Sequence, residues 1–393
     1  MPAGQPLSAA VVVAVTSAPS KALLLLCLTF NLIDIGAAVL PVDRADVLYH
    51  SYDGGGVEIT GPSILIRKGF GDSVSGAYNH YVDNVSSASI DVITTASPYT
   101  ESRKENSIAV DYLHDKTIMS LALIKSVEPD FDSSTVNINF SQDMFGDLTT
   151  VNMGFAVGDN SISRNGDSSF SEESSSRNYR LSVSQIISKD MIMAVAFETI
   201  VDEGYLNNPY RSVRYEDASV PRGYSYQGEV YPRTRSSNAL ALRARYYLQH
   251  RAAIHGNYRI YSDSWGIDAN DIELGYTQRY GSNWIFDARI RYYNQSGADF
   301  YSDLFPFQDS QNFLARDKEL STFNNVTLGA GVSYEFDNAN WRTFKRGTVN
   351  FNFDYIFFNY DDFRDLTQSG SVGDEPLYSF DAVVIRAFAS LWF

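Results

Sequence analysis

The sequence is poor in several residue types on which whole protein classes depend. It has one cysteine, Cys27, and only 12 prolines among 393 residues. A single cysteine cannot form an internal disulfide, and it excludes the cysteine-based metal sites of small exported domains. Basic residues are also scarce, because 31 Lys and Arg stand against 47 Asp and Glu, a formal charge of −16. A nucleic-acid partner is therefore not expected, since binding a polyanion needs clustered basic side chains.

Long apolar runs are missing as well, whereas aromatic residues are abundant. The chain has 26 Tyr and 24 Phe, and aromatic residues make up 14% of it. An α-helical membrane bundle would need several apolar segments of about 20 residues each. A disordered chain would contain far fewer aromatic and β-branched residues. This composition is typical of a β protein that either packs as a sandwich or closes as a barrel.

The N-terminal region predicts a targeting segment. Residues 21–38, KALLLLCLTFNLIDIGAA, combine one positive charge, a short apolar run and small residues near the end. This pattern predicts a secretory signal peptide that is cleaved near Ala38, preceded by a lead of 20 residues. A membrane anchor is the alternative, but the uninterrupted apolar stretch is shorter than about 20 residues. We therefore expect residues 1–38 to be lead and signal, and residues 39–393 to form one domain without a thiol.

Apolar and polar residues alternate along most of the remaining chain. In residues 148–158, for example, Val151, Met153 and Phe155 share one face, and Asn152 and Gly154 lie on the other. Alternation with a period of two predicts β-strands. Sixteen segments follow this pattern: 46–52, 57–68, 73–85, 106–115, 117–128, 134–145, 148–159, 178–188, 191–201, 237–249, 252–262, 271–280, 283–293, 320–336, 346–360 and 378–393.

Strand length and connection length favour a membrane barrel over a sandwich. Most of these segments reach the roughly 9 to 11 residues that cross a bilayer at a tilt, beyond the roughly five to six of globular sheets. The connections then alternate between two kinds. Tight turns are predicted at 69–72, 115–116, 146–147, 189–190, 250–251 and 281–282, and long polar connections at 86–105, 160–177, 202–236, 294–319 and 361–377. Short turns on one side and long loops on the other are typical of bacterial outer-membrane barrels.

The predicted fold is therefore all-β: a single antiparallel transmembrane barrel of about 16 strands, with 14 or 18 as alternatives, in the outer membrane of a Gram-negative bacterium. Closure is required because lipid offers backbone groups no hydrogen-bond partner. The last strand ends in an alternating apolar row, including Ile385, Leu391 and Phe393. A terminal aromatic after such a row resembles the signal read by the barrel-assembly machinery. The expected partners are this machinery, the lipid bilayer and lipopolysaccharide.

Several strings in the mature region are similar to one known family. They are SSASIDV (86–92), TTASPYTESR (94–103), GYLNNPYRSVRY (204–215), YPRTRSS (231–237), SDSWGID (262–268), FYSDLFPF (300–307) and ARDKELSTFNN (315–325). In this order they resemble the DUF3570 family of outer-membrane barrels. The resemblance implies the barrel fold and no settled activity. It also implies a small lipoprotein as a partner and an envelope redox setting, because such genes often neighbour a lipoprotein and a flavin transferase. It transfers no catalytic or cofactor residue.

Arginines recur on the non-apolar face of consecutive predicted strands, which is the face toward the barrel interior. They are Arg180, Arg243, Arg245, Arg259, Arg279, Arg289 and Arg291, and we expect Glu273, Asp287 and Asp354 to oppose them inside the barrel. One interpretation is a positive stripe that attracts anions. The other is that each arginine pairs with an inward carboxylate or an acidic loop, which only satisfies buried charge.

The longest predicted connection, 202–236, is rich in Tyr and Arg. We expect it to form an ordered cap or an inward plug through Tyr205, Tyr210, Arg211, Arg214, Tyr215, Tyr231, Arg233 and Arg235. Loops of this length usually narrow a pore or bind a partner. Acidic residues in other connections, such as Asp130 and Asp132, are interpreted as a solvated rim, since none has the spacing of a calcium loop.

The sequence predicts no enzyme, no cofactor and no metal site. Three of the five histidines, His114, His250 and His255, fall near the predicted periplasmic turns, away from substrates outside the cell. The favoured function is a passive pore for small polar solutes. The alternative is a plugged structural or binding barrel that holds a periplasmic or surface partner.

Overall fold

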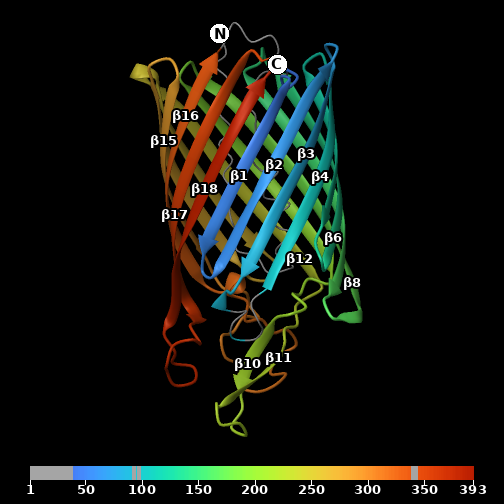
Figure 1. The fold of residues 1–393 in the computed structure, drawn as a ribbon, viewed down its shortest axis with the longest axis vertical. Coiled ribbons are helices and arrows are strands. Elements are labelled where there is room, and N and C mark those ends of the chain that lie inside the picture. The colour runs from blue at the N-terminus through green and yellow to red at the C-terminus, as the bar shows by residue number, and fades with distance from the viewer. Residues whose placement is uncertain (1–38, 91–93, 95–98, 338–343) are drawn as a thin grey trace.

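A closed antiparallel barrel of sixteen strands forms the body of the protein (Figure 1). The computed structural model describes residues 39–90, 94, 99–337 and 344–393. The barrel strands are β1 (Arg44–Gly54), β2 (Val57–Phe70), β3 (Val74–Ser87), β4 (Tyr99–His114), β5 (Thr117–Val127), β6 (Phe131–Met144), β7 (Thr149–Arg164), β8 (Asp167–Ser188), β9 (Met191–Gly204), β12 (Thr234–Leu248), β13 (Ala252–Asp263), β14 (Asp268–Tyr280), β15 (Trp284–Gln295), β16 (Phe323–Asp337), β17 (Arg346–Arg364) and β18 (Leu377–Trp392).

The predicted fold and the number of strands are confirmed, and each predicted segment overlaps one barrel strand. The ring closes between the first and the last strand, which pair without interruption from Arg44↔Trp392 to Gly54↔Ala382. Closure leaves no unpaired strand edge, so the backbone of every barrel strand has hydrogen-bond partners on both sides. No helix among the described residues is long and apolar enough to cross a membrane.

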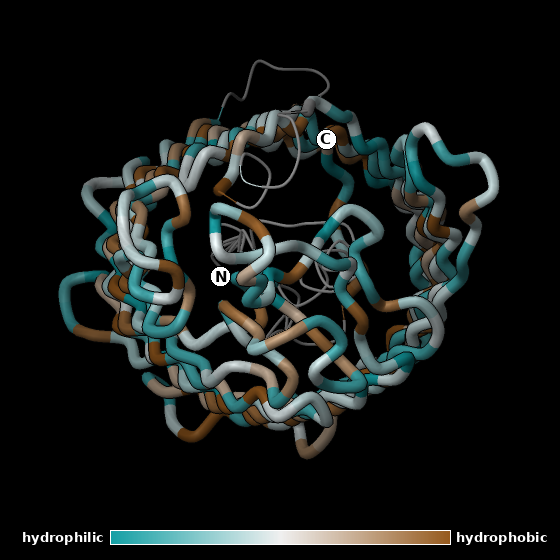
Figure 2. Tube along the Cα trace, turned by 90° about the horizontal axis from the view of Figure 1, so that it is seen from below, coloured by the Kyte–Doolittle hydropathy of each residue, from teal (hydrophilic) through white to brown (hydrophobic). Residues whose placement is uncertain are grey.

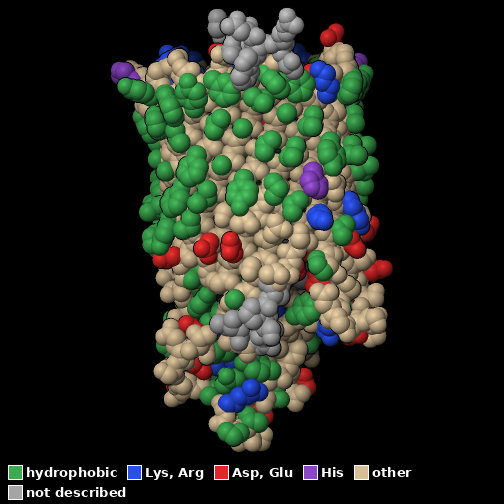
Figure 3. All heavy atoms as spheres, viewed as in Figure 1, with side chains coloured by type: hydrophobic (Ala, Val, Ile, Leu, Met, Phe, Trp, Pro, Cys, Tyr) green, Lys and Arg blue, Asp and Glu red, His purple; other side chains and the backbone are tan. Residues whose placement is uncertain are grey.

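The alternation of the sequence separates the two faces of the barrel wall. On β12, Leu240 and Leu242 are exposed on the outer face, whereas Ala239 and Ala241 are buried on the inner face. The same holds around the ring, and Figure 3 shows the outward apolar side chains as a broad green band. A band of exposed Leu, Ile, Val, Phe and Tyr of this extent is what hydrocarbon, and not water, stabilises.

The two ends of the barrel differ. One end, here called the turn end, carries tight connections such as Asp115–Lys116 and Lys189–Asp190, and β1 begins and β18 finishes there (Figure 1). The opposite end, here called the loop end, carries the long connections 205–233, 296–322 and 365–376. A small two-stranded sheet of β10 (Ser212–Glu216) and β11 (Tyr224–Gly228) projects from the first of these.

One predicted loop is wrong. Residues 160–177 are not a long polar connection, because β7 and β8 continue through them as a paired hairpin. Only Asn165 and Gly166 lie between these strands, and Gly166 has the left-handed φ of 83° that favours glycine in a tight turn. The segment is rich in Ser and Glu because a strand that extends beyond the membrane needs no apolar face.

Two other predicted loops are longer than the observed ones for the same reason, because the adjoining strands extend into them. Strand β4 begins at Tyr99 inside the predicted connection 86–105, and β17 continues to Arg364. Strand β16 instead begins later than predicted, because Lys318–Leu320 form a 3-10 turn capped by the Asp317 side chain. The predicted lead and signal peptide, residues 1–38, lie outside the described residues.

Candidate functional site

The inner faces of β12, β13, β14 and β15 form a wall with an excess of positive charge. Odd-numbered side chains point inward there, because even-numbered neighbours such as Leu242, Ile260 and Ile290 are exposed to the outside. Seven arginines and four carboxylates are on this inner face: Arg235, Arg243, Arg245, Arg259, Arg279, Arg289 and Arg291, and Asp263, Asp271, Glu273 and Asp287. The seven positive charges exceed the four negative charges by three, and we call this surface the basic wall.

The inner faces of β2, β3, β4 and β5 carry the opposite balance. Their inward charged side chains are two arginines and four carboxylates: Arg67 and Arg103, and Asp83, Glu101, Glu105 and Asp111. The four negative charges exceed the two positive charges by two, and we call this surface the acidic wall. In the closed ring these four strands stand eight places from β12–β15, directly across the barrel. The interior is therefore crossed by an electric field that runs from one wall to the other.

Several arginines of the basic wall are held by ion pairs. Asp354, from the inner face of β17, accepts hydrogen bonds from Arg289 at 2.6 Å and from Arg386 at 2.6 Å. Arg291 lies 3.2 Å from Asp271 on the neighbouring strand. Such pairs orient the guanidinium groups and reduce, but do not cancel, the excess positive charge of the wall. Arg386 was missed at the sequence level because it is a lone arginine in an apolar strand.

The structure separates the predicted arginines into groups. Arg279 lies at the turn end and pairs with Glu335 at 2.5 Å. Arg180 belongs to β8, two places from β12 in the ring, and donates to Asn137 at 3.0 Å. Within the basic wall, Arg243, Arg245, Arg259, Arg289 and Arg291 lie together between Arg235 at the loop end and Arg279 at the turn end. The acids that we expected across the barrel from these arginines do not lie there. Glu273 and Asp287 are on the same wall as the arginines, and Asp354 lies between Arg289 and Arg386. Strand parity predicts the face of a residue, but only the order in the ring predicts what stands across from it.

A buried polar cluster supports the acidic wall. The Nε2 atom of His50 lies 2.8 Å from Asp83 and 3.1 Å from the Tyr81 hydroxyl, and the His50 and Tyr81 rings stack with centroids 5.0 Å apart. Arg103 is 3.3 Å from Asp83 and 3.6 Å from Glu105. These side chains come from β1, β3 and β4. Because each charged group contacts an opposite charge or a ring nitrogen, the cluster fixes the side chains of this wall in place.

The long connections fold over the mouth of the barrel at the loop end. Seen from that end, their segments cross the interior of the ring (Figure 2). We call the connections 205–233, 296–322 and 365–376 together the cap. Two apolar clusters stabilise it, and one contains the rings of Tyr231, Trp265 and Phe300 with centroids 5.2 to 5.5 Å apart. The other contains Phe305 and Leu314 beside β10. Packed aromatic pairs of this kind add about 0.5–1.5 kcal/mol each beyond their buried area.

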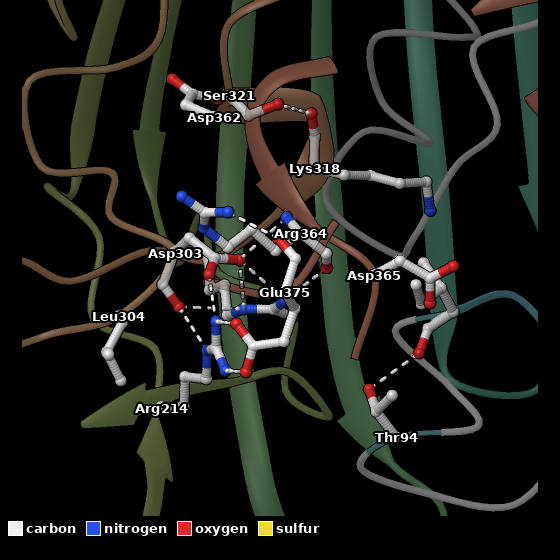
Figure 4. A network of polar contacts seen from close by, with 12 residues as sticks. Thr94, Arg214, Asp303, Leu304, Lys318, Ser321, Asp362, Arg364, Asp365 and Glu375 are labelled. Atoms are coloured by element: carbon white, nitrogen blue, oxygen red, sulfur yellow. Dashed lines mark hydrogen bonds and ion pairs between the residues drawn. The ribbon is translucent and has the colours of Figure 1, made fainter. Parts of the chain in front are cut away.

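A buried ion network joins all three connections of the cap (Figure 4). Arg214, from the first connection, is fully buried and forms ion pairs with Asp303 of the second and Glu375 of the third, the latter at 2.7 Å. Arg316 lies 2.8 Å from the same Asp303 carboxylate, and the Arg364 backbone N–H donates to it at 3.1 Å. Asp303 is therefore the shared anion of two buried guanidinium groups.

The pKa values of two groups reflect this environment. Burial by itself lowers the pKa of Arg214, but the hydrogen bond that Arg214 donates to Glu375 and the charge of Asp303 outweigh it and hold that pKa above its ordinary value. Burial raises the pKa of Glu229 to about 7; the charge of Asp317 adds to this and the charge of Arg211 opposes it. Glu229 accepts hydrogen bonds from the Arg316 backbone N–H at 2.8 Å and the Tyr231 hydroxyl at 2.6 Å.

The predicted cap residues occupy different parts of this assembly. Arg211 pairs with Asp317 of the second connection at 2.7 Å. Tyr205 packs on Phe170, and the Tyr210 hydroxyl accepts from the Asn165 backbone N–H at 2.7 Å, so both contact the β7–β8 hairpin. The remaining residues contact the cap core, the rim or β12: Tyr215 packs beside Phe305 and Leu314, Tyr231 lies in the aromatic cluster, Arg233 pairs with Glu172, and Arg235 of β12 pairs with Asp263.

A group of three carboxylates lies at the rim of the loop end. One oxygen each of Glu101, Glu128 and Asp130 falls within 4.8 Å of the other two. Carboxylate oxygens are the ligands that calcium prefers, so these residues could hold a divalent cation. The interpretation of Asp130 as part of a solvated rim is wrong, because its side chain is only 4% exposed. The sequence spacing does not reveal this burial.

The predicted insertion signal occupies the closing strand. Ile385 and Leu391 lie in β18 at odd-numbered positions, whose inward even-numbered neighbours such as Val384 and Arg386 are buried. The Phe393 backbone N–H donates to the Asp43 carbonyl at 3.3 Å, beside the start of β1.

The fold and the charged interior define a transmembrane β-barrel with a polar lumen and a folded cap. The chain belongs to the family described as "Protein of unknown function (DUF3570)", whose model matches residues 74–355. A comparison with curated proteins found no match.

Solved structures similar to this chain are outer-membrane barrels. One is a bacterial polysaccharide outer membrane secretin, at 7% identity and TM-score 0.49, covering 90% of this chain and 99% of that one. Another is the CymD monoaromatic hydrocarbon channel, at 11% identity and TM-score 0.43, covering 90% and 88%. A third is OmpT of Vibrio cholerae, at 11% identity and TM-score 0.41, covering 91% and 100%. None of these likenesses assigns a role to this chain.

Proposed function

We propose that this protein is an outer-membrane channel for small polar solutes, with its turn end in the periplasm and its cap narrowing the outer mouth. The observation that supports this proposal most is that a basic wall stands opposite an acidic wall inside the barrel. A barrel of about 16 strands is wider than its own side chains can fill, so an interior lined by charge is hydrated. A field across a hydrated passage favours small solutes that carry both signs of charge, because such solutes can align with it.

The proposal involves no covalent chemistry and no cofactor. It requires only that solutes pass between the two walls after they have passed the cap. Insertion through the barrel-assembly machinery, guided by the last strand, belongs to the same proposal.

The second candidate is a closed barrel that binds a partner at its surface. The observation that favours it is the buried ion network of Arg214, Asp303 and Arg316, which fixes the cap over the mouth. The lipoprotein partner implied by the family resemblance would suit such a role. The two candidates differ in whether ions cross the barrel.

Conductance across a planar lipid bilayer distinguishes the two. Protein purified from the outer membrane in mild detergent is expected to produce stepwise increases in current, because the charged interior admits hydrated ions. The Asp303→Asn variant, with a loosened cap, is expected to give larger or longer openings. Heat-denatured protein is the control for detergent artefacts. If wild type and variant both stay silent after insertion, the channel proposal is rejected in favour of the closed barrel.

A further inference from the structure

A basic patch faces outward where the apolar band of β3, β4 and β5 ends. On β4 the outward apolar series ends at Ile108 and is followed by Asn106 and Lys104. On the outer face of β5, Lys125 follows Leu123 and is itself followed by the exposed Val127. The strand register pairs His80 with Asn106, and Asn106 with Lys125. Three adjacent strands therefore place polar side chains side by side. We call His80, Lys104, Asn106 and Lys125 the outer basic patch.

The contacts inside this patch orient it and leave its positive charges accessible. The His80 Nδ1 atom lies 2.9 Å from the Asn106 side-chain oxygen, which also accepts from the Tyr78 hydroxyl at 2.8 Å. Lys104 is exposed and has no ion-pair partner among the residues that the structure describes. Lys125 is half exposed, lies 3.7 Å from Asp132, a long distance for an exposed pair, and donates a long hydrogen bond to the Ser134 hydroxyl at 3.3 Å. Such a contact contributes little, so both ammonium groups are available to another anion.

The same edge of the band has the opposite charge on the neighbouring strands. Asp53 of β1 and Glu58 of β2 are directly paired and exposed, and Asp381 of β18 is exposed nearby. Figure 3 shows red side chains below one part of the green band and blue side chains below another. An anion that approaches from the surrounding membrane would therefore be repelled by one side of the barrel and attracted by the other.

We propose that the outer basic patch binds the phosphate groups of a phosphorylated glycolipid in the outer leaflet. The patch directly adjoins side chains that lie in hydrocarbon, such as Ile108 and Leu123, so its occupant must itself sit at the lipid–water boundary. Lysines at this depth extend their ammonium groups toward the boundary, where lipid phosphates lie. Two lysines on adjacent strands suit a headgroup with two phosphates better than one with a single phosphate. The inference rests on the orientation proposed above, but not on conductance.

Titration with defined lipids tests this inference. Delipidated protein in detergent is mixed with bisphosphorylated lipid A, with lipid A lacking both phosphates, and with phosphatidylglycerol, and bound lipid is counted by native mass spectrometry. We expect wild type to bind bisphosphorylated lipid A most tightly. The Lys104→Gln/Lys125→Gln variant is expected to bind it about 30-fold more weakly, because each lost lysine weakens binding roughly fivefold.

Matched variants make the outcome decisive. Lys116→Gln/Lys189→Gln also removes two exposed lysines, but at the turn end, and should bind as wild type does. All variants should keep the folded barrel's mobility in unheated gels. Equal affinity of wild type and the Lys104→Gln/Lys125→Gln variant would overturn the proposal, as would equal affinity for lipid A without phosphates. Tighter binding of phosphatidylglycerol would overturn the choice of a glycolipid.

Discussion

Replacing Asp303 with asparagine is expected to release the cap from the mouth of the barrel. Asparagine keeps the shape of the side chain but removes the charge that Arg214 and Arg316 share. Two buried guanidinium groups would lose their common anion, and breaking a buried pair in this way typically costs about 3–5 kcal/mol. Because 1.4 kcal/mol is tenfold in an equilibrium, trypsin should cut within residues 205–233 at least about 100-fold faster in folded protein.

Asp299→Asn is the matched control for this experiment. Asp299 lies in the same connection of the cap and is exposed, so its loss changes the charge without removing a buried contact. Its cleavage rate should stay close to that of wild type. Equal cleavage rates in the Asp303 variant and wild type, with the barrel folded in both, would contradict the assignment of Asp303 as the anion that holds the cap.

If the barrel conducts ions as proposed, neutralising Arg243 and Arg245 together is expected to shift its ion selectivity toward cations. Both side chains lie half-buried on the inner face of β12, within the basic wall. Removing two of its charges lowers the local potential, which is of the order of several kT in charged passages, so the anion-to-cation permeability ratio should fall roughly two- to tenfold. The measurement is the reversal potential of the Arg243→Gln/Arg245→Gln variant in a KCl gradient.

Removing a negative charge from the same region provides a second test of ion selectivity. Asp354→Asn removes the carboxylate between Arg289 and Arg386, so it should shift the reversal potential toward anions. Arg251→Gln removes a charge from the exposed turn before β13 and should leave selectivity unchanged. If the double arginine variant has the same reversal potential as wild type, the arginines of this wall only satisfy buried charge, which is the alternative interpretation of their pattern.

The sequence alone predicts the barrel because the same short-range pattern of apolar and polar residues is repeated in every strand. Lipid outside and water inside impose an apolar–polar alternation on every strand, and a one-residue error in β12 would reverse the faces of Leu242 and Arg243. The tight turns are also local, as at Gly55 and Gly56, whose φ values of 58° and 75° suit a two-residue hairpin. Where the wall leaves the membrane this constraint ends, which is why the Ser- and Glu-rich hairpin of β7 and β8 was predicted as a loop.

The sequence predicts an ordered cap in the long connection 202–236, but it does not predict the ion pairs of Arg214 with Asp303 and Glu375 that join the three connections. Arg214 lies 161 positions from Glu375 and 89 positions from Asp303, and no sequence pattern connects them. Three connections must first be brought to one end of a closed ring before these side chains can meet. The charge separation between the walls has the same origin, since β2 and β12 become opposite only when sixteen strands close.

The account depends most on the claim that the barrel crosses the outer membrane with its cap outside. Two variants that each add one cysteine to a Cys27→Ser background test it directly: Ser371→Cys in the exposed part of the cap, and Ser73→Cys in the exposed turn between β2 and β3. Intact cells are treated with a maleimide whose polyethylene glycol chain is too large to cross the outer membrane. We predict labelling of the Ser371 variant in intact cells, and of the Ser73 variant only after the outer membrane is permeabilised. Labelling of the Ser73 variant in intact cells, or recovery of the protein in the soluble fraction, would contradict the account.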